Sequence, residues 1–171
     1  METWDAIRSR RAVRSFTDQP IEGKDLDRIL EAGRRAPSSM NGQRWDFVVV
    51  TRRERLQHLS QVWRYGQHVA SSAATVALVT PQSDDPHERE SIAFDLGQAV
   101  MSMLIAAADL GIGSCHSSVY HKELARSLLA YPGDRRCDYL VALGYPADRS
   151  LKPLKHHKRR SFDDVVHRDR W

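Results

Sequence analysis

The stretch ERESIAFDLGQAVMSMLIAAADL, residues 88–110, is the strongest structural signal in the chain. Apolar residues recur from Ile92 to Leu110 at steps of four, three, four, three and four, which is the spacing of one helical face. A second row, from Ala93 to Ala107, is apolar as well. A helix that is apolar on two faces must be buried on both. We therefore expect one face to meet the chain's own sheet and the other to meet a second copy; the alternative is a central helix wrapped by its own domain alone.

The segments on either side of this helix have patterns that predict alternating strands and helices. Apolar residues at helical spacing predict a helix over 24–35, which ends before Pro37. Short apolar runs predict strands, and Pro81 is expected to end the second of them. The last stretch of the chain has no periodic pattern, and we expect it to cross the surface and dock elsewhere. The further predicted elements are strands over 46–51, 75–80 and 137–145, helices over 53–61 and 121–129, and a turn into a strand within 111–120.

Length and composition favour one ordinary globular domain. The chain has 171 residues, of which 41% are hydrophobic and 28% charged, so disordered and fibrous classes are excluded. No repeat or linker divides it, and we expect a single domain over 1–171 with an α/β or α+β fold. The longest apolar run without a charge, Leu96 to Ala108, is shorter than the roughly 20 residues of a membrane span, and the charged N-terminus lacks signal-peptide features. We therefore expect a cytoplasmic protein with no membrane partner.

Several common catalytic and metal-binding motifs are missing. The segment GIGSCH begins like a dinucleotide fingerprint, but His116 stands where the third glycine should be, and a helix precedes it. Cys115 and Cys137 are expected to be reduced, buried thiols, and the histidines do not have the spacing of metal ligands. The sequence predicts no metal site and no side-chain nucleophile, acid or base.

Basic residues gather near both ends of a chain whose net charge is +4. Such clusters are either solvated surface or a site for phosphate or nucleic acid. Arg10 and Arg14 would share a face if their segment were helical. Nucleic acid is not an expected partner, because no binding motif is present and the aromatic residues do not alternate with the basic ones.

Five segments, in this order and spacing, resemble the nitroreductase family of FMN-dependent oxidoreductases. They are RRAVRSF (10–16), APSSMNGQRW (36–45), ADLGIGSC (108–115), ALGYP (142–146) and KRRSFDDVVH (158–167). The resemblance covers essentially the whole chain, and APSSMNGQRW is its most specific part. It implies an α+β fold, a three-layer α-β-α sandwich with a mixed, mainly antiparallel sheet, in a homodimer with the flavin at the interface.

The resemblance also implies roles for particular residues. The phosphate and ring edge of FMN would be contacted by Arg10, Arg11, Ala12, Arg14, Lys158 and Arg160. The other protomer would contribute Pro37, Ser38, Ser39 and Asn41, and the isoalloxazine edge near N5 would lie along His116, Ser117 and Ser118. Guanidinium groups bind phosphate bidentately, so the basic residues near both ends of the chain would bind the same FMN phosphate.

This sequence departs from the family pattern at several of these positions. Ala12 stands where a hydroxyl is frequent, and Arg44 replaces a proline beside Trp45. Arg44 is therefore a candidate substrate-binding residue for an anionic group, and the alternative is a surface arginine paired with Asp46 or solvent. The chain also lacks the insertion that in many family members follows the second strand and covers the flavin, which implies a more open pocket.

The implied activity is transfer of hydride from NADH or NADPH through FMN to a small-molecule acceptor, a nitroaromatic or a quinone, by a ping-pong mechanism. The chemistry is the cofactor's, so no catalytic side chain is demanded. The alternative is a flavin-binding protein for storage or sensing, without turnover.

Overall fold

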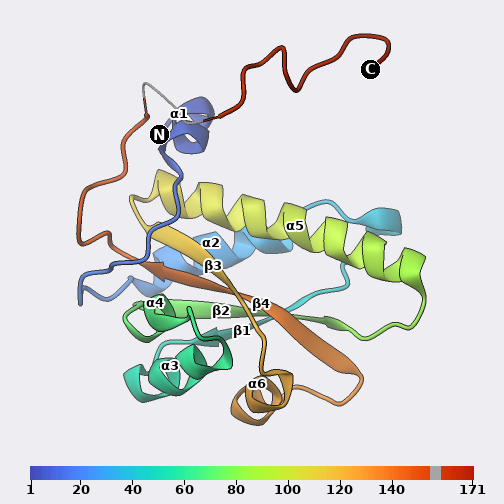
Figure 1. The fold of residues 1–171 in the computed structure, drawn as a ribbon. Helices are drawn as coiled ribbons and strands as arrows, with labels where there is room; N and C mark the ends of the chain where they lie inside the picture. The colour runs from blue at the N-terminus through green and yellow to red at the C-terminus, as the bar shows by residue number, and fades with distance from the viewer. Residues whose placement is uncertain (155–158) are drawn as a thin grey trace.

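A four-stranded antiparallel sheet forms the middle layer of the molecule (Figure 1). The computed structural model describes residues 1–154 and 159–171. The strands follow the order β1-β2-β4-β3, and their bounds are β1 Asp46–Val50, β2 Ala74–Pro81, β3 Gly113–Ser118 and β4 Arg135–Gly144. β2 and β4 are central; β2 is buried along nearly its whole length and β4 from Leu140 to Gly144, because helices cover both faces there. The predicted strands are confirmed, with Pro81 as the last residue of β2 rather than the first beyond it.

Helices cover both faces of this sheet, which makes the three-layer α-β-α sandwich that the resemblance implied. One apolar core lies between the sheet and α2 and α5, and a second lies between the sheet and α3, α4 and α6. The predicted helix over 53–61 divides into a helix and a 3₁₀ turn. The bounds are α1 Thr3–Ser9, α2 Gly23–Arg34, η1 Ser39–Asn41, α3 Arg53–Leu59, η2 Ser60–Val62, α4 Gln67–Ala70, α5 Pro86–Asp109 and α6 Lys122–Leu129.

Residues 10–16 are extended along the edge of β3 and are not helical, so the condition under which Arg10 and Arg14 would share a helical face is not met. Ala12 pairs in parallel with Ser114, and the Val13 N–H donates to the Ser114 carbonyl at 3.0 Å. A glycine permits this close approach, because a Cβ added at Gly113 would lie 2.8 Å from the Val13 Cβ. The four strands themselves pair antiparallel throughout, so the mainly antiparallel character of the sheet is confirmed, and the described parallel pairing is this isolated bridge.

Helix α5 spans the molecule and organises one layer. The Asp85 side chain caps its first turn by accepting the His87 N–H at 3.0 Å. Its inner face packs on α2, where Met103 lies so close to Gly33 that an added Cβ would be 2.2 Å from the Met103 Cε. By length and composition α5 is long and apolar enough to cross a membrane, contrary to the expectation from its shorter uncharged run. Its inner face belongs to the apolar core that it forms with α2 and the sheet.

The second apolar row of α5 is only partly covered within the protomer. Leu104 and Ala107 are buried, whereas Ala93 and Gly97 are exposed. The prediction that one protomer leaves a second apolar face open thus holds for the first half of that row alone.

The chain after β4 follows the N-terminal segment before it leaves the body of the molecule (Figure 1). Phe16 forms a bridge with Pro146, and Leu154 exchanges a hydrogen bond in each direction with Arg8, both at 3.3 Å. Residues 159–171 contain no regular helix or strand, as the absence of periodicity predicted.

Candidate functional site

The N-terminal arginines divide into one that is held by the protein and two that are not. Arg11 donates to Asp148 at 3.3 Å and to the Arg149 carbonyl at 2.7 Å, so it fastens the N-terminal segment to the chain after β4. In the part of the chain that the structure describes, Arg10 and Arg14 have no hydrogen bond or ion pair from their guanidinium groups. Two guanidinium groups beside one strand edge, without carboxylate partners, are suited to binding an anion.

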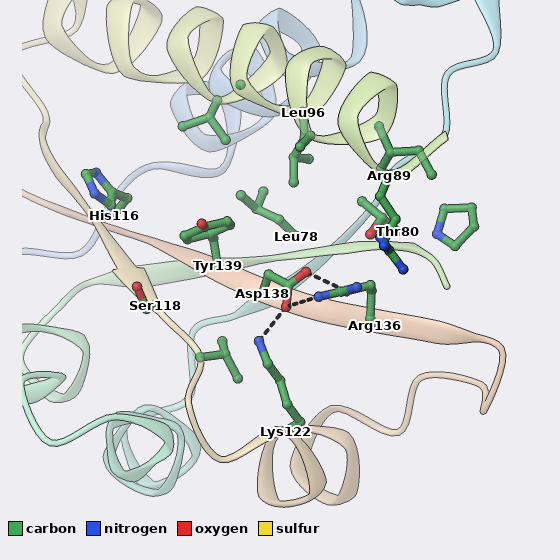
Figure 2. Close-up of a pocket in the computed structure, with 16 residues that line it drawn as sticks. Leu78, Thr80, Arg89, Leu96, His116, Ser118, Lys122, Arg136, Asp138 and Tyr139 are labelled. Atoms are coloured by element: carbon green, nitrogen blue, oxygen red, sulfur yellow. Dashed lines mark hydrogen bonds and ion pairs between the residues drawn. The ribbon is translucent and has the colours of Figure 1, made fainter. Parts of the chain in front are cut away.

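Strand β3 presents alternate side chains to its two faces, so the three residues predicted beside the ring edge do not point the same way. His116 and Ser118 face α5 and line a cavity there (Figure 2). Ser117 is buried on the opposite face, and its hydroxyl donates to the Ser118 carbonyl at 3.4 Å. The Ser117 side chain therefore does not face this cavity.

The cavity between α5 and the sheet has a volume of about 580 Å³. Apolar side chains, among them Leu78 and Leu96, form much of its wall (Figure 2). Charged side chains gather at the end away from His116: Arg89, Lys122, Arg136 and Asp138. This combination of apolar walls and a few polar groups is typical of small-molecule sites.

Asp138 joins two of these cations. It accepts from Arg136 Nε at 2.6 Å and also from Lys122. Burial alone would raise the pKa of Asp138, but the hydrogen bonds from Arg136 and Lys122 outweigh it and the pKa is lowered. This cluster was not predicted from the sequence, where its one signal is the i, i+2 spacing of Arg136 and Asp138, which puts both on one face of a strand.

The loop over 36–45 is fastened to the first half of α5. The Ser39 N–H donates to both carboxylate oxygens of buried Asp95, each at 3.1 Å. Arg44 donates to Glu88 at 3.2 Å and to the Ser91 hydroxyl at 2.8 Å. The proposed surface pairing of Arg44 with Asp46 is wrong, because Arg44 turns inward to α5.

The backbone of this loop is unusual. Met40, Asn41 and Gln43 have φ values of 52°, 56° and 46°, the left-handed region that residues with a Cβ seldom adopt. Met40 is fully exposed, and Pro37 and Asn41 are exposed as well, while Ser38 is half-buried and accepts the Gln43 N–H at 3.0 Å. A loop fixed in this way presents its tip outward.

The predicted site residues form two groups that one protomer does not bring together. Residues 10–16 lie beside the C-terminal end of α5, and η1 lies beside its N-terminal end (Figure 1). Arg160 is exposed on the tail and donates to the Asp164 carbonyl; none of the described contacts joins it to Arg10 or Arg14. Lys158 lies outside the described residues.

His68, a buried polar residue that was not predicted as a site residue, lies close to Arg14 of the first group. Its Nε2 has no hydrogen-bond partner among the described residues. Burial lowers the pKa of His68, and the charges of Arg14 and His116 lower it further. No sequence pattern distinguishes this histidine from the exposed ones.

Both cysteines are free and buried, as predicted. Burial raises the pKa of Cys115 and raises that of Cys137 to about 12, so neither is a nucleophile at neutral pH. Within residues 1–154 and 159–171 no three metal-ligating side chains gather.

Comparison with known proteins agrees with this architecture. A model of the nitroreductase family matches residues 7–75 and 54–145. The "Putative NADH dehydrogenase/NAD(P)H nitroreductase" of Archaeoglobus fulgidus is 32% identical over 96% of both chains, and the FMN reductase [NAD(P)H] of Bacillus subtilis is 28% identical over 88% of this chain and 68% of its own. The structure of NADPH:FMN oxidoreductase from Vibrio harveyi complexed with NAD⁺ superposes with a TM-score of 0.85 at 24% identity, over 97% of this chain and 76% of that one. The family match covers most of the fold just described, and the chain belongs to the nitroreductase family.

Proposed function

We propose that this chain is an FMN-dependent oxidoreductase that takes hydride from NADH or NADPH and delivers it to a quinone or nitroaromatic acceptor. Membership of the family and the relatives named for FMN and NAD(P)H support the cofactor, the reductant and the enzymatic activity. The observation that carries the proposal for this chain is the pair Arg10 and Arg14, whose guanidinium groups have no described carboxylate partner beside the edge of β3.

The residues present fit FMN. Its phosphate carries close to two negative charges, which Arg10 and Arg14 would bind, with Arg160 and Lys158 from the tail as further candidates. Arg11 would act indirectly, because its contacts to Asp148 and Arg149 hold the segment in place. When bound, FMN supplies the hydride transfer chemistry, and the chain supplies binding and orientation. His116 and Ser118 would border the ring from β3, while Ser117 would contribute through its backbone alone.

A homodimer would complete this site. The loop with Pro37, Ser38, Ser39 and Asn41 lies at the far end of α5 from Arg10 and Arg14, and its exposed tip is available to a second copy. Phe94 and Met101 on α5, which are 72% and 46% exposed and do not line the cavity, support the same arrangement. We propose one domain over 1–171 in each copy, and a cytoplasmic location. We assign Arg44 to fixing this loop rather than to binding substrate, because its guanidinium already contacts Glu88 and Ser91.

Two-substrate kinetics test the mechanism. With one cavity beside the predicted ring edge, donor and acceptor would bind in turn, so plots of velocity with NADH or NADPH and a quinone should give parallel lines. Excess acceptor should inhibit competitively against the reductant. Intersecting lines would contradict ping-pong order. Bound flavin that neither reductant reduces anaerobically would favour the alternative of a storage or sensing protein.

A further inference from the structure

The cavity beside His116 has an excess of positive charge that the proposed function does not explain. Its wall contains three cationic side chains, Arg89, Lys122 and Arg136, against one carboxylate, Asp138. Asp138 is shared by Lys122 and Arg136, so it neutralises at most one of them. Arg89 donates to the backbone carbonyls of Ser83 and Asp84, at 3.4 and 3.3 Å, and no carboxylate partner of it is described.

The charge is confined to one end of an otherwise apolar space. In Figure 2 His116 lies at one end of the cavity, and Arg89 and Arg136 lie at the other, with Leu78, Leu96 and Tyr139 between them. A volume of about 580 Å³ is enough for a compound of one or two aromatic rings. A ligand with a flat apolar body and one anionic group would match both parts of the cavity at once.

We propose that this cavity binds the electron acceptor and that its cationic end selects acceptors carrying an anionic substituent, such as a carboxylate or sulfonate on an aromatic ring. The inference rests on the proposed function, because it takes His116 and Ser118 to border the flavin. With the anionic group at Arg89 and Arg136, the ring extends along Leu78 and Leu96 toward His116. Arg89 and Arg136 act as specificity-determining residues. Asp138 determines how much positive charge of Arg136 and Lys122 remains to attract the ligand.

The test compares two acceptors of nearly equal size and shape, 4-nitrobenzoate and the uncharged 4-nitrobenzamide, in the flavin-loaded protein. The ratio of kcat/KM for the anion over the amide should fall about two- to fivefold in Arg89→Gln, as expected for one partly exposed charge. The ratio should rise in Asp138→Asn, because Lys122 and Arg136 lose their shared carboxylate. Arg135→Gln is the matched control: it removes a cation from the same strand that pairs with Asp46 at 3.4 Å outside this cavity, and the ratio should not change.

Equilibrium binding gives a readout that does not depend on turnover. Calorimetric titration of the oxidised, flavin-loaded protein with 4-nitrobenzoate should show binding that weakens in Arg89→Gln, tightens in Asp138→Asn and weakens as salt is added. Turnover of the amide with a ratio that stays constant across the variants would overturn the inference and leave the proposed function intact. Reduction of neither acceptor by a flavin-loaded protein would contradict the proposed function, and the titration would still decide whether the cavity binds the anion. A second copy that covers the cavity would abolish binding of 4-nitrobenzoate, which would also overturn the inference.

Discussion

The carboxylate of Asp95 accepts the backbone N–H of Ser39 with both of its oxygens, each at 3.1 Å, across 56 residues of sequence. Asp95 is almost fully buried in α5, and the guanidinium of Arg44 stands 3.8 Å from the same carboxylate. A buried charge is tolerated only where hydrogen bonds and an opposite charge compensate it. Asp95 therefore holds the loop on both sides of the left-handed Met40 and Asn41.

Replacement of Asp95 by Ala should destabilise the protein and loosen this loop. The Ser39 N–H and Arg44 would lose their shared acceptor, and an unpaired buried group of this kind costs on the order of 3 kcal/mol. Urea denaturation of Asp95→Ala measures the cost. Glu88→Gln is the control, because Glu88 is half exposed and its contact with Arg44 should contribute less than about 1 kcal/mol. Equal losses in the two variants would show that Asp95 has no special role.

The arrangement around Asp95 illustrates which features the sequence could predict. Apolar spacing located α2 and α5, and short apolar runs located β1, β2 and β4, because the pattern within one element decides which of its faces is buried. The contacts of Arg44 with Glu88 and Ser91 join residues more than forty positions apart, and no local pattern encodes them. The same holds for the group of Lys122, Arg136 and Asp138, which meets only when α6 packs beside β4.

In the N-terminal segment, by contrast, a local pattern was present but long-range pairing decided the structure. Local spacing allowed Arg10 and Arg14 to share a helical face, yet pairing with β3 made the segment extended. Long-range strand pairing prevailed because Gly113 lets Val13 approach closely. The family motif identified the arginines as functional candidates, but only the structure distinguishes Arg11, which is paired, from Arg10 and Arg14.

That distinction leads to a second prediction, about flavin binding. Arg10→Ala, Arg14→Ala or Arg160→Ala should each weaken FMN binding to the apoprotein by about ten- to a hundredfold, the equivalent of a charge-assisted contact of roughly 1.5 to 3 kcal/mol. Riboflavin lacks the phosphate, so its affinity should hardly change. Fluorescence titration with both flavins measures this difference.

Arg11→Ala is the matched control for these variants. Its loss should lower the free energy of unfolding, because Arg11 binds Asp148 and the Arg149 carbonyl. FMN and riboflavin affinities should then fall together, if they fall at all. A phosphate-specific loss in Arg11→Ala, or an equal loss of both flavins in Arg10→Ala, would reverse the assignment of these residues.

The third prediction concerns the homodimer. Phe94 and Met101 lie on the outer side of α5, with 72% and 46% of their surface exposed. We expect a charge at either position to oppose association of two copies while the protomer stays folded. Sedimentation of Phe94→Asp should therefore give 19.5 kDa, and the unchanged protein should give twice that mass.

Met103 is the contrasting position on the same helix. It is fully buried against α2, so Met103→Asp should unfold the protomer rather than separate two copies. Circular dichroism distinguishes unfolding from dissociation. A folded, flavin-loaded monomer at micromolar concentration of the unchanged protein would rule out the dimeric site.

The last prediction uses the buried imidazole of His68, whose pKa is lowered by burial and by the charges of Arg14 and His116. An unfolded histidine takes up a proton near pH 6.5, whereas folded His68 resists protonation to lower pH. The stability that His68 contributes is therefore fully present above pH 6.5 and is lost as the pH falls from there toward its folded pKa. The free energy of unfolding of the apoprotein should decrease between pH 7.5 and 5.5, and His68→Gln should reduce that decrease. His58→Gln, which changes an exposed histidine, should leave the dependence of the unfolding free energy on pH as it was.

Bound FMN should also reduce this dependence on pH, since a phosphate at Arg14 would offset the positive charge that helps to lower the pKa of His68. Equal slopes in the unchanged protein and His68→Gln would mean that His68 is not the group responsible, and equal slopes with and without FMN would argue against phosphate binding at Arg14.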